Sequence, residues 1–257
     1  MYFSGLRKSL IESAEESNIE LSFCKNADEV DVEKTDGIIA VGRFLSTKLK
    51  KMKQLGIQVL FVDSNPNPHE FNSIQPNLQM MVETAIEYFV QAGYQKIGFI
   101  GGRSWDSMEG RHVLRDTRTR CFESRARELG LFNQNHVFIG DNFSVDSGYQ
   151  VGQEIVGKIR DDLPQGFLVA SDPLAVGVLQ AFNENKLTVP EDVSMISIND
   201  IDIAKYVSPP LTTFRIDTEE LGKVAIETLR NLIVSPKKSK RMILLDADLV
   251  FRKSFVI

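Results

Sequence analysis

Short apolar runs alternate with longer amphipathic segments along the whole chain, and no other feature of the sequence constrains the fold as strongly. The run 166–170 has the composition of a buried strand, and apolar residues at helical spacing follow it over 173–183. The same alternation predicts further strands at 19–23, 38–41, 57–62, 97–100, 137–139, 193–198, 242–245 and 249–251. It predicts further helices at 6–14, 47–54, 78–91, 117–129, 147–159 and 221–233. Such alternation indicates an α/β protein whose parallel sheets are covered by helices on both faces.

The length and the composition favour two lobes over one. A chain of 257 residues is longer than one hydrophobic core usually organises. Its net charge of -5 argues against direct contact with a nucleic-acid backbone, because domains that make this contact are usually basic. Cys24 and Cys121 are too few for a disulfide framework and suit a reducing compartment. Since no apolar run could span a membrane and no signal peptide is visible, we expect a soluble cytoplasmic protein without membrane contact.

No catalytic, metal-binding or cofactor motif of high specificity is present. The sequence has no Walker A loop and no HExxH, CxxC or GxSxG motif. Residues 98–103 resemble a dinucleotide fingerprint only loosely, because its third glycine is missing, so a structural turn is the better interpretation. His69, His112 and His136 stand in separate loops without the spacing of a metal site. We therefore expect neither an enzyme nor a bound cofactor or metal ion.

Polar side chains follow three of the predicted strands at the point where each strand ends. They are Asp63 after the run 58–62, Ser171 and Asp172 after the run 167–170, and Asn199 and Asp200 after the run 193–198. The carboxyl ends of parallel strands form the edge at which such folds bind ligands. Carboxylates and amides there suit a hydroxyl-rich ligand such as a sugar. Asp63 and Asp172 each have an alternative role, as the cap of a turn or a helix.

Four sequence motifs follow one another along nearly the whole chain. They are AGYQKIGFIGG at 92–102, FLVASDPLAVG at 167–177, VPEDVS followed by IND at 189–200, and SPPLTT at 208–213. In this order they resemble the motifs of the lactose/galactose-repressor (LacI/GalR) family. The resemblance implies an effector-binding core of two Rossmann-like lobes with parallel sheets, similar to periplasmic sugar-binding proteins and joined by three crossover strands. It places residues 1–76 and 217–244 in the N-terminal lobe, and residues 77–214 and 245–257 in the C-terminal lobe.

The resemblance also carries six ligand-binding positions onto this chain. They are Asp63, Arg118, Phe143, Ser171, Asp172 and Asn199. Arg118 stands where the family has its ligand-gripping arginine, and Arg120 is the neighbour that competes with it for this role. Phe143 occupies the place of an aromatic ring that stacks on the ligand. Ser171 and Asn199 replace the Asn and the Asp of the family pattern, so the pattern does not fix the identity of the effector.

Two parts of the family pattern have no counterpart in these residues. The DNA-binding helix-turn-helix with its hinge helix is one, and the first core strand, expected before Tyr2 and Phe3, is the other. A central strand missing from the N-terminal sheet would leave backbone groups unpaired. We therefore predict that the N-terminal lobe is less stable than its partner, or that another segment fills the gap.

The resemblance predicts a sugar-responsive transcriptional repressor. A small effector, a sugar or a sugar phosphate, would bind between the lobes of a homodimer and alter DNA binding by a separate N-terminal domain. The alternative on the same fold is the solute-binding protein of a sugar transport system, which a signal peptide or a lipobox cysteine would favour. An enzyme would need a nucleophile, a base or a cofactor loop that the sequence does not provide.

Overall fold

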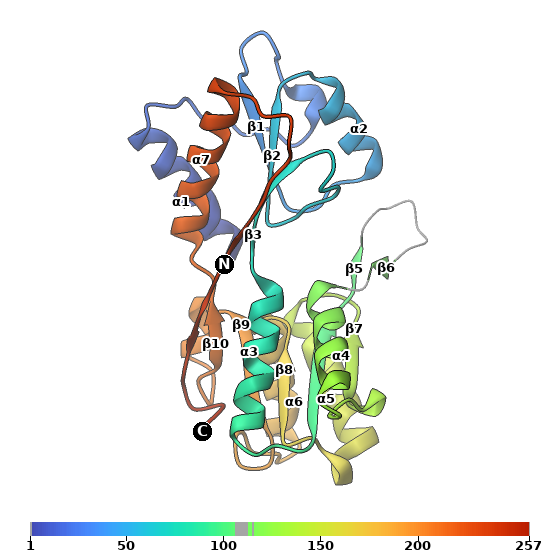
Figure 1. Cartoon of the computed structure of the whole chain (residues 1–257). Helices are drawn as coiled ribbons and strands as arrows, with labels where there is room; N and C mark the ends of the chain where they lie inside the picture. The colour runs from blue at the N-terminus through green and yellow to red at the C-terminus, as the bar shows by residue number, and fades with distance from the viewer. Residues whose placement is uncertain (1, 106–112, 115, 257) are drawn as a thin grey trace. The chain divides into compact units, whose positions relative to one another are not determined.

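The chain folds into two units, each built around its own sheet (Figure 1). The computed structural model describes residues 2–105, 113–114 and 116–256. Unit 1 contains residues 2–76, 105 and 217–245, and unit 2 contains residues 77–104, 113–114, 116–216 and 246–256. Within the described residues, the chain passes from one unit to the other at 76–77, 104–105, 216–217 and 245–246. Each unit is therefore assembled from segments that are distant in the sequence.

Unit 1 is a four-stranded parallel sheet covered by helices. Its strands lie in the order β1 (Gly37–Val41), β2 (Gln58–Val62), β3 (Asn72–Pro76) and β11 (Met242–Leu245). The helices α1 (Tyr2–Glu16) and α7 (Thr218–Val234) lie side by side (Figure 1). The helix α2 (Ser46–Gln54) packs against the short helix η1 (Ala27–Glu29).

The alternation of side chains along β2 divides the core of unit 1 into two clusters. Leu60 packs with Leu10 of α1 and Leu221 of α7. Phe61 points to the opposite face and packs with Met52 of α2, because successive residues of a strand face opposite sides of the sheet. Helices on both faces of the sheet thus have an apolar surface to cover.

The predicted strand at 19–23 is wrong. This segment has no regular secondary structure, although Ile19 and Leu21 pack against the cluster between α1 and α7. A strand needs a neighbour to complete its backbone hydrogen bonds. Among the described strands, β1 is the last of the sheet on this side and pairs only with β2. The apolar pattern is therefore used for packing and not for a ladder.

Unit 2 is built on a six-stranded sheet. Its strands lie in the order β12 (Asp248–Val250), β10 (Thr212–Arg215), β9 (Ser194–Asn199), β8 (Gly166–Val169), β4 (Ile97–Gly102) and β7 (Val137–Gly140). Neighbouring strands run parallel, except that β12 is antiparallel to β10. The helix α3 (Leu78–Gln91) packs against α4 (Thr117–Glu128), and α5 (Val145–Ile159) packs against α6 (Asp172–Glu184).

The remaining short elements lie outside the two main sheets. They are the helices η2 (Gln134–His136), η3 (Arg160–Asp162) and η4 (Asp202–Lys205), and a two-stranded pair of β5 (Ser104–Trp105) and β6 (Val113–Leu114).

The core of unit 2 is one continuous cluster. All four residues of β8 are buried, as expected for a parallel strand covered on both faces. Phe99 of β4 stacks on Phe122 of α4 with 5.1 Å between the ring centroids. Phe89 of α3 stacks on Tyr94 and makes an edge-to-face contact with Phe255. The predicted α/β class with parallel sheets is confirmed.

The apolar pattern did not predict two strands, β3 and β10, because polar residues occupy their buried positions. Asn72 and Ser73 are buried at the start of β3, and Thr212 and Thr213 are buried at the start of β10. Hydrogen bonds compensate this burial. The Asn72 side chain accepts from the N–H of Arg241 at 2.9 Å, for example. A strand whose polar side chains are paired inside the protein lacks the apolar pattern by which strands are recognised.

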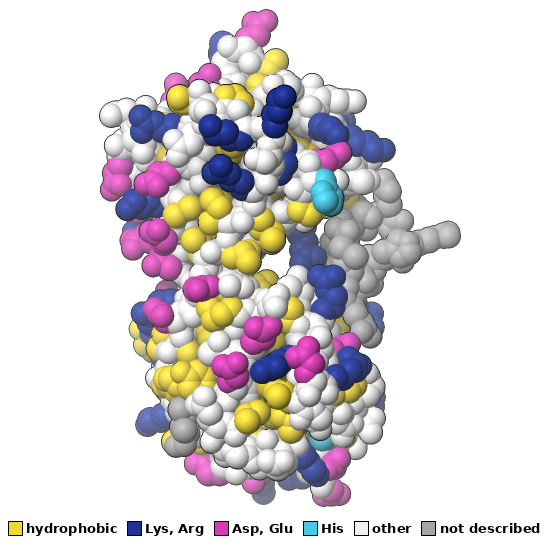
Figure 2. Space-filling view, viewed as in Figure 1, with side chains coloured by type: hydrophobic (Ala, Val, Ile, Leu, Met, Phe, Trp, Pro, Cys, Tyr) yellow, Lys and Arg dark blue, Asp and Glu magenta, His cyan; other side chains and the backbone are white. Residues whose placement is uncertain are grey.

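Within the described residues, no helix is both long enough and apolar enough to cross a bilayer. Basic and acidic side chains both occur on the face shown in Figure 2.

Candidate functional site

The carboxyl ends of five parallel strands of unit 2 meet at one edge of its sheet. They are the ends of β4, β7, β8, β9 and β10. Phe143 follows β7, Ser171 and Asp172 follow β8, and Asn199 is the last residue of β9. Arg118, near the start of α4, reaches this edge through the carbonyl group that follows β8. Five of the six predicted ligand residues therefore belong to the edge at which parallel sheets bind ligands.

Arg118 is held at this edge by a carboxylate and by a backbone carbonyl. Its Nε and Nη2 donate to Oδ1 and Oδ2 of Asp116 at 2.7 and 3.0 Å, and its Nη1 donates to the carbonyl of Ala170. Asp116 also caps α4, because Oδ1 accepts from the Arg118 backbone N–H at 3.0 Å. A guanidinium group has five N–H donors, so two remain without a partner among the described residues. Arg120 is exposed, so Arg118 and not its neighbour faces the site.

Phe143 offers an aromatic face beside this arginine. The centre of the Arg118 guanidinium lies 4.6 Å from the centroid of the Phe143 ring, which is a cation–π contact. The ring is half-buried. An apolar face next to hydrogen-bond donors is the combination that sugar rings use, because a sugar has C–H faces and hydroxyl edges.

The hydroxyl of Ser171 is buried and has no hydrogen-bond partner among the residues that the structure describes. Ser171 is only 4% exposed, and it is the N-cap of α6 without making a capping bond. An unpaired buried polar group costs about 1–3 kcal/mol, and native proteins pair nearly all of them. The residue follows Ala170, whose carbonyl accepts from Arg118. The Ser171 hydroxyl therefore has hydrogen-bonding capacity that no described group uses.

The strand β9 ends in two successive residues with left-handed backbone. Asn199 has φ 122° and Asp200 has φ 52°, which residues with a Cβ atom rarely adopt. The Asp200 carboxylate is 2% exposed and accepts from Arg215 at 2.8 Å and from Arg252 at 2.6 Å. The Asn199 amide is half-buried and makes no hydrogen bond within the described parts of the chain. Its donors and acceptor are thus available to a ligand.

Asp172 lies beneath the edge, and its burial contradicts the prediction that it contacts a ligand. It is 0% exposed. Its Oδ1 accepts from the hydroxyls of Ser197 and Thr213, and its Oδ2 accepts from the N–H of Ile201 at 2.8 Å. Burial raises the pKa of Asp172 to about 6, because the loss of water outweighs these three donors. Sequence alone could not show that this carboxylate has three donors whereas the hydroxyl of the preceding buried serine has no described partner.

Asp63, the sixth predicted residue, belongs to unit 1. It follows β2 with a left-handed φ of 66°, and its backbone N–H donates to the carbonyl of Ile74 at 3.0 Å. The hydroxyl of Tyr2 donates to Asp63 Oδ1 at 2.8 Å. Nearby in sequence, Asn65 has a buried Oδ1 without a partner among the described residues. Unit 1 thus has a polar strand end of its own, and effector contact by Asp63 stays a prediction.

Two residues of these sites were missed in the sequence. Asp116 stands directly before a predicted helix, where an N-cap is common, and this signal could have found it. Tyr2 could not be found, because its partner Asp63 is 61 positions away and only the fold brings them together.

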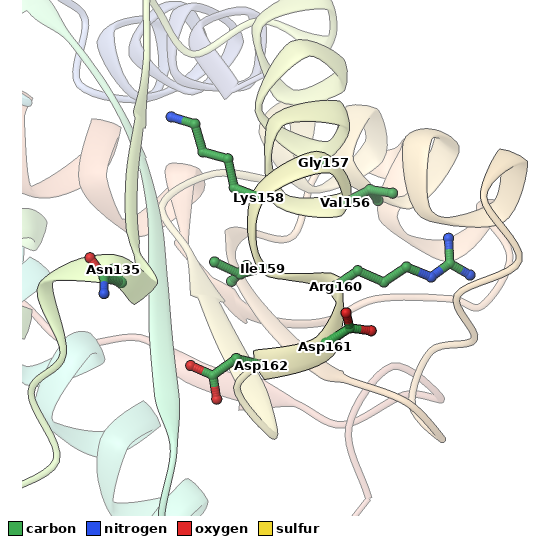
Figure 3. A pocket seen from close by; sticks show the side chains of 8 residues that line it. All are labelled: Asn135, Val156, Gly157, Lys158, Ile159, Arg160, Asp161 and Asp162. Atoms are coloured by element: carbon green, nitrogen blue, oxygen red, sulfur yellow. The ribbon is translucent and has the colours of Figure 1, made fainter.

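A pocket of about 490 Å³ lies elsewhere on unit 2 (Figure 3). It is lined by Asn135 and residues 156–162. Asn135 precedes β7 and Asp162 precedes β8, so the pocket lies at the amino ends of the parallel strands. It contains no aromatic side chain and none of the predicted ligand residues. The pocket is therefore distinct from the edge that carries Arg118 and Ser171.

The histidines do not form a metal site in the described structure. In this part of the chain, no three His, Cys, Asp or Glu side chains group to hold a metal ion. His136 is buried with Nε2 at 3.4 Å from Asp162, and His69 is exposed. His112 lies outside the described residues.

Comparison with known proteins gives one consistent result. Residues 86–255 match the family model described as periplasmic binding protein-like domain. The chain is 36% identical to the HTH-type transcriptional regulator GanR of Bacillus subtilis (strain 168) over 256 residues, which are 99% of this chain and 77% of GanR.

Solved structures show the same fold. One neighbour is the LacI family transcriptional regulator CCPA from Weissella paramesenteroides with bound sucrose, with a TM-score of 0.83, 18% identity and coverage of 98% of this chain and 93% of that one. A complex of the transcriptional regulator CelR with cellobiose gives a TM-score of 0.82 at 19% identity, and covers 99% of this chain and 79% of that one. With its motifs, its fold and its relatives in agreement, the chain belongs to the LacI/GalR family of transcriptional regulators.

Proposed function

We propose that the two units form the effector-binding core of a sugar-responsive repressor, and that the carboxyl edge of the unit 2 sheet binds a neutral sugar. The contacts would come from Arg118, Ser171 and Asn199, with Phe143 against a face of the ring. Binding would shift the population of the core between two states and thereby change DNA binding by a helix-turn-helix domain distinct from these two units.

The observation that carries this proposal is the unpaired hydroxyl of Ser171, the residue after Ala170, whose carbonyl accepts from Arg118. A sugar hydroxyl can both donate and accept, so it would satisfy the serine and one of the two remaining N–H donors of the arginine. The free amide of Asn199 can likewise serve as donor and acceptor. These groups recognise hydroxyls without requiring any charge on the ligand.

The charges at this edge favour a neutral sugar over a sugar phosphate. Arg118 is paired with Asp116, and Asp200 is paired with both Arg215 and Arg252. A phosphate binds best where a cation has no internal partner. Among the described residues that surround the site, each arginine already has a carboxylate partner, so hydroxyl recognition fits better.

Calorimetric titration with sucrose, cellobiose, lactose and ribose tests the proposal. We expect at least one of the four sugars to bind with a dissociation constant in about the micromolar to millimolar range. Glucose 6-phosphate serves as the phosphorylated comparison and is expected to bind more weakly than the best neutral sugar. A correctly folded chain that binds none of the four would contradict a sugar effector of this kind.

The remaining assignments follow from the family and have their own tests. We expect a cytoplasmic homodimer without catalytic activity, since the relatives found by comparison are named as transcriptional regulators. This naming also favours a regulator over a solute-binding protein of a transport system. Light scattering of the purified chain would report the dimer, and a monomer at all concentrations up to about 100 μM would contradict it.

A further inference from the structure

We propose that Asp172 is a positioning residue that holds the loop Asn199–Ile201 in the conformation that binds sugar. The proposal rests on the proposed function, because the loop presents the amide of Asn199 at the same strand edge as Ser171. It replaces the sequence prediction that Asp172 itself touches the effector. The carboxylate is fully buried, so it acts on a ligand only through the groups that it holds.

Three donors from separate parts of unit 2 converge on this carboxylate. The hydroxyl of Ser197 in β9 and the hydroxyl of Thr213 in β10 donate to Oδ1, the latter at 2.7 Å. The backbone N–H of Ile201, in the loop after β9, donates to Oδ2 at 2.8 Å. Since Asp172 begins α6, one side chain links the helix, two strands and the loop.

The loop needs such a link because its backbone is unfavourable. Asn199 and Asp200 both have positive φ angles, 122° and 52°, and conformations of this kind persist only where surrounding contacts enforce them. On the C-terminal side of Asp200, one such contact is the hydrogen bond from the Ile201 N–H to the Asp172 carboxylate. Thr213 contributes a second contact, because its Oγ1 also accepts from the backbone N–H of Asp200 at 3.3 Å.

The side chain of Asp200 anchors the loop in a different direction. It points to Arg215 and Arg252 and not to the effector edge. Asp200 and Ile201 are thus both held by hydrogen bonds. Asn199 is the loop residue whose polar side chain has no described partner. The geometry thus separates two roles, since Asp172 and Asp200 hold the backbone and Asn199 remains free to bind.

The first experiment replaces Asp172 in the full chain. In Asp172→Ala the Ile201 N–H loses its acceptor, so we expect its exchange with solvent, measured by NMR, to rise roughly tenfold or more. In Asp172→Asn the amide oxygen still accepts from Ile201, and its NH₂ group can donate to the Ser197 and Thr213 oxygens. We expect exchange at Ile201 to stay within about threefold of the wild type in this conservative variant.

The second readout is sugar affinity, measured with sucrose, cellobiose, lactose and ribose. Asp172→Ala should weaken the best of these sugars roughly tenfold, and Asp172→Asn should keep most of the affinity. If Asp172→Ala fails to fold, two serines of β9 give a matched pair. Ser197→Ala removes a donor to Asp172, whereas Ser194→Ala removes a bond to the Tyr94 hydroxyl at the other end of the strand.

The outcomes separate positioning from stability and from the proposed function. Both serine variants should lose similar stability, but only Ser197→Ala should speed exchange at Ile201 and weaken sugar binding. Equal exchange and equal affinity in the two variants would overturn the inference. If the wild type binds none of the four sugars, the proposed function fails, whereas unchanged Ile201 exchange in Asp172→Ala would overturn the positioning role on its own.

Discussion

Two buried serines of unit 2 differ in a way that separates stability from binding. The Ser254 hydroxyl accepts from the N–H of Thr212 at 2.8 Å and donates to the carbonyl of Met195 at 2.7 Å. The Ser171 hydroxyl has no partner in the described chain. Removing a paired hydroxyl costs stability, whereas removing an unpaired one relieves a penalty.

We therefore predict opposite effects of the two alanine variants. Ser171→Ala should keep or raise the free energy of unfolding, by up to about 1 kcal/mol, and weaken sugar binding roughly tenfold. Ser254→Ala should lose about 1–3 kcal/mol of stability and keep the sugar affinity within about twofold. Urea unfolding and calorimetric titration measure the two quantities. A Ser171→Ala variant that loses as much stability as Ser254→Ala would show that its hydroxyl is paired in the free protein.

Asp172 gives a pH-dependent prediction at the same scale. Its folded pKa of about 6 lies above the ordinary value of 3.8, so between these values the folded chain keeps a proton that the unfolded chain has lost. The stability from this proton is lost as the pH rises through about 6. From about pH 5 to about pH 7.5 the loss is about 1.4 kcal/mol.

The variant Asp172→Asn does not titrate and should lack this loss. Urea unfolding of both proteins at the two pH values isolates the contribution, because all other groups titrate alike in both. We expect the wild type to lose about 1.4 kcal/mol more than the variant on going to the higher pH. Identical pH dependence of the two proteins would mean that Asp172 keeps its ordinary pKa in the fold.

At the scale of residues, the sequence predicts which polar residues stand at strand ends better than it predicts the groups that surround each of them. The polar residues after β8 and β9 were predictable, because the residues that end parallel strands share one edge. Which of two adjacent buried residues has hydrogen-bond partners was not predictable. Ser171 and Asp172 are neighbours, and only the donors from Ser197, Thr213 and Ile201 show that the carboxylate is enclosed.

At the scale of elements, the contact between α5 and α6 depends on the absence of side chains. A Cβ atom on Gly148 of α5 would lie 2.1 Å from the carbonyl oxygen of Leu174 in α6. A Cβ atom on Gly157, later in the same helix, would meet nothing within 4 Å. The two glycines share a helix and differ only in what surrounds them.

Alanine at these two positions should therefore change stability in opposite directions. Gly148→Ala forces the helices apart and should cost about 3 kcal/mol of unfolding free energy. Gly157→Ala removes only the flexibility of glycine within a helix and should gain about 0.5–1 kcal/mol. Thermal or urea unfolding measures both variants. A loss of stability in Gly157→Ala as large as that in Gly148→Ala would contradict close packing as the cause.

Elements were predictable where burial follows a simple period. The helix α3 has the predicted bounds 78–91, because its apolar face continues without interruption. The strand at 19–23 was predicted from an equally apolar run and is absent, because strands also need a partner. The strands β3 and β10 were missed, because paired polar side chains occupy their buried positions. Local pattern therefore predicts burial, but strand pairing depends on the rest of the sheet.

At the scale of the whole molecule, the two units differ in how their apolar cores are organised. Unit 2 has one continuous core under a six-stranded sheet. Unit 1 divides its apolar residues between two smaller clusters on a four-stranded sheet, whose strand β1 pairs on one side only among the described strands. Buried apolar area is the main stabilising contribution to a domain. Unit 1 should therefore open at a lower free energy than unit 2.

Native-state hydrogen exchange at increasing urea concentrations tests this difference. We expect amides of β1 and β2 to exchange at least about tenfold faster than those of β4 and β8, and to respond at lower urea concentration. Gly148→Ala provides the control, because it weakens unit 2 alone. It should speed exchange in unit 2 and so reduce the difference in exchange rate between the two units. Equal protection of both units, lost in a single transition, would mean that the chain unfolds as one cooperative body. In that case the division of the core into separate clusters would not set the stability of unit 1.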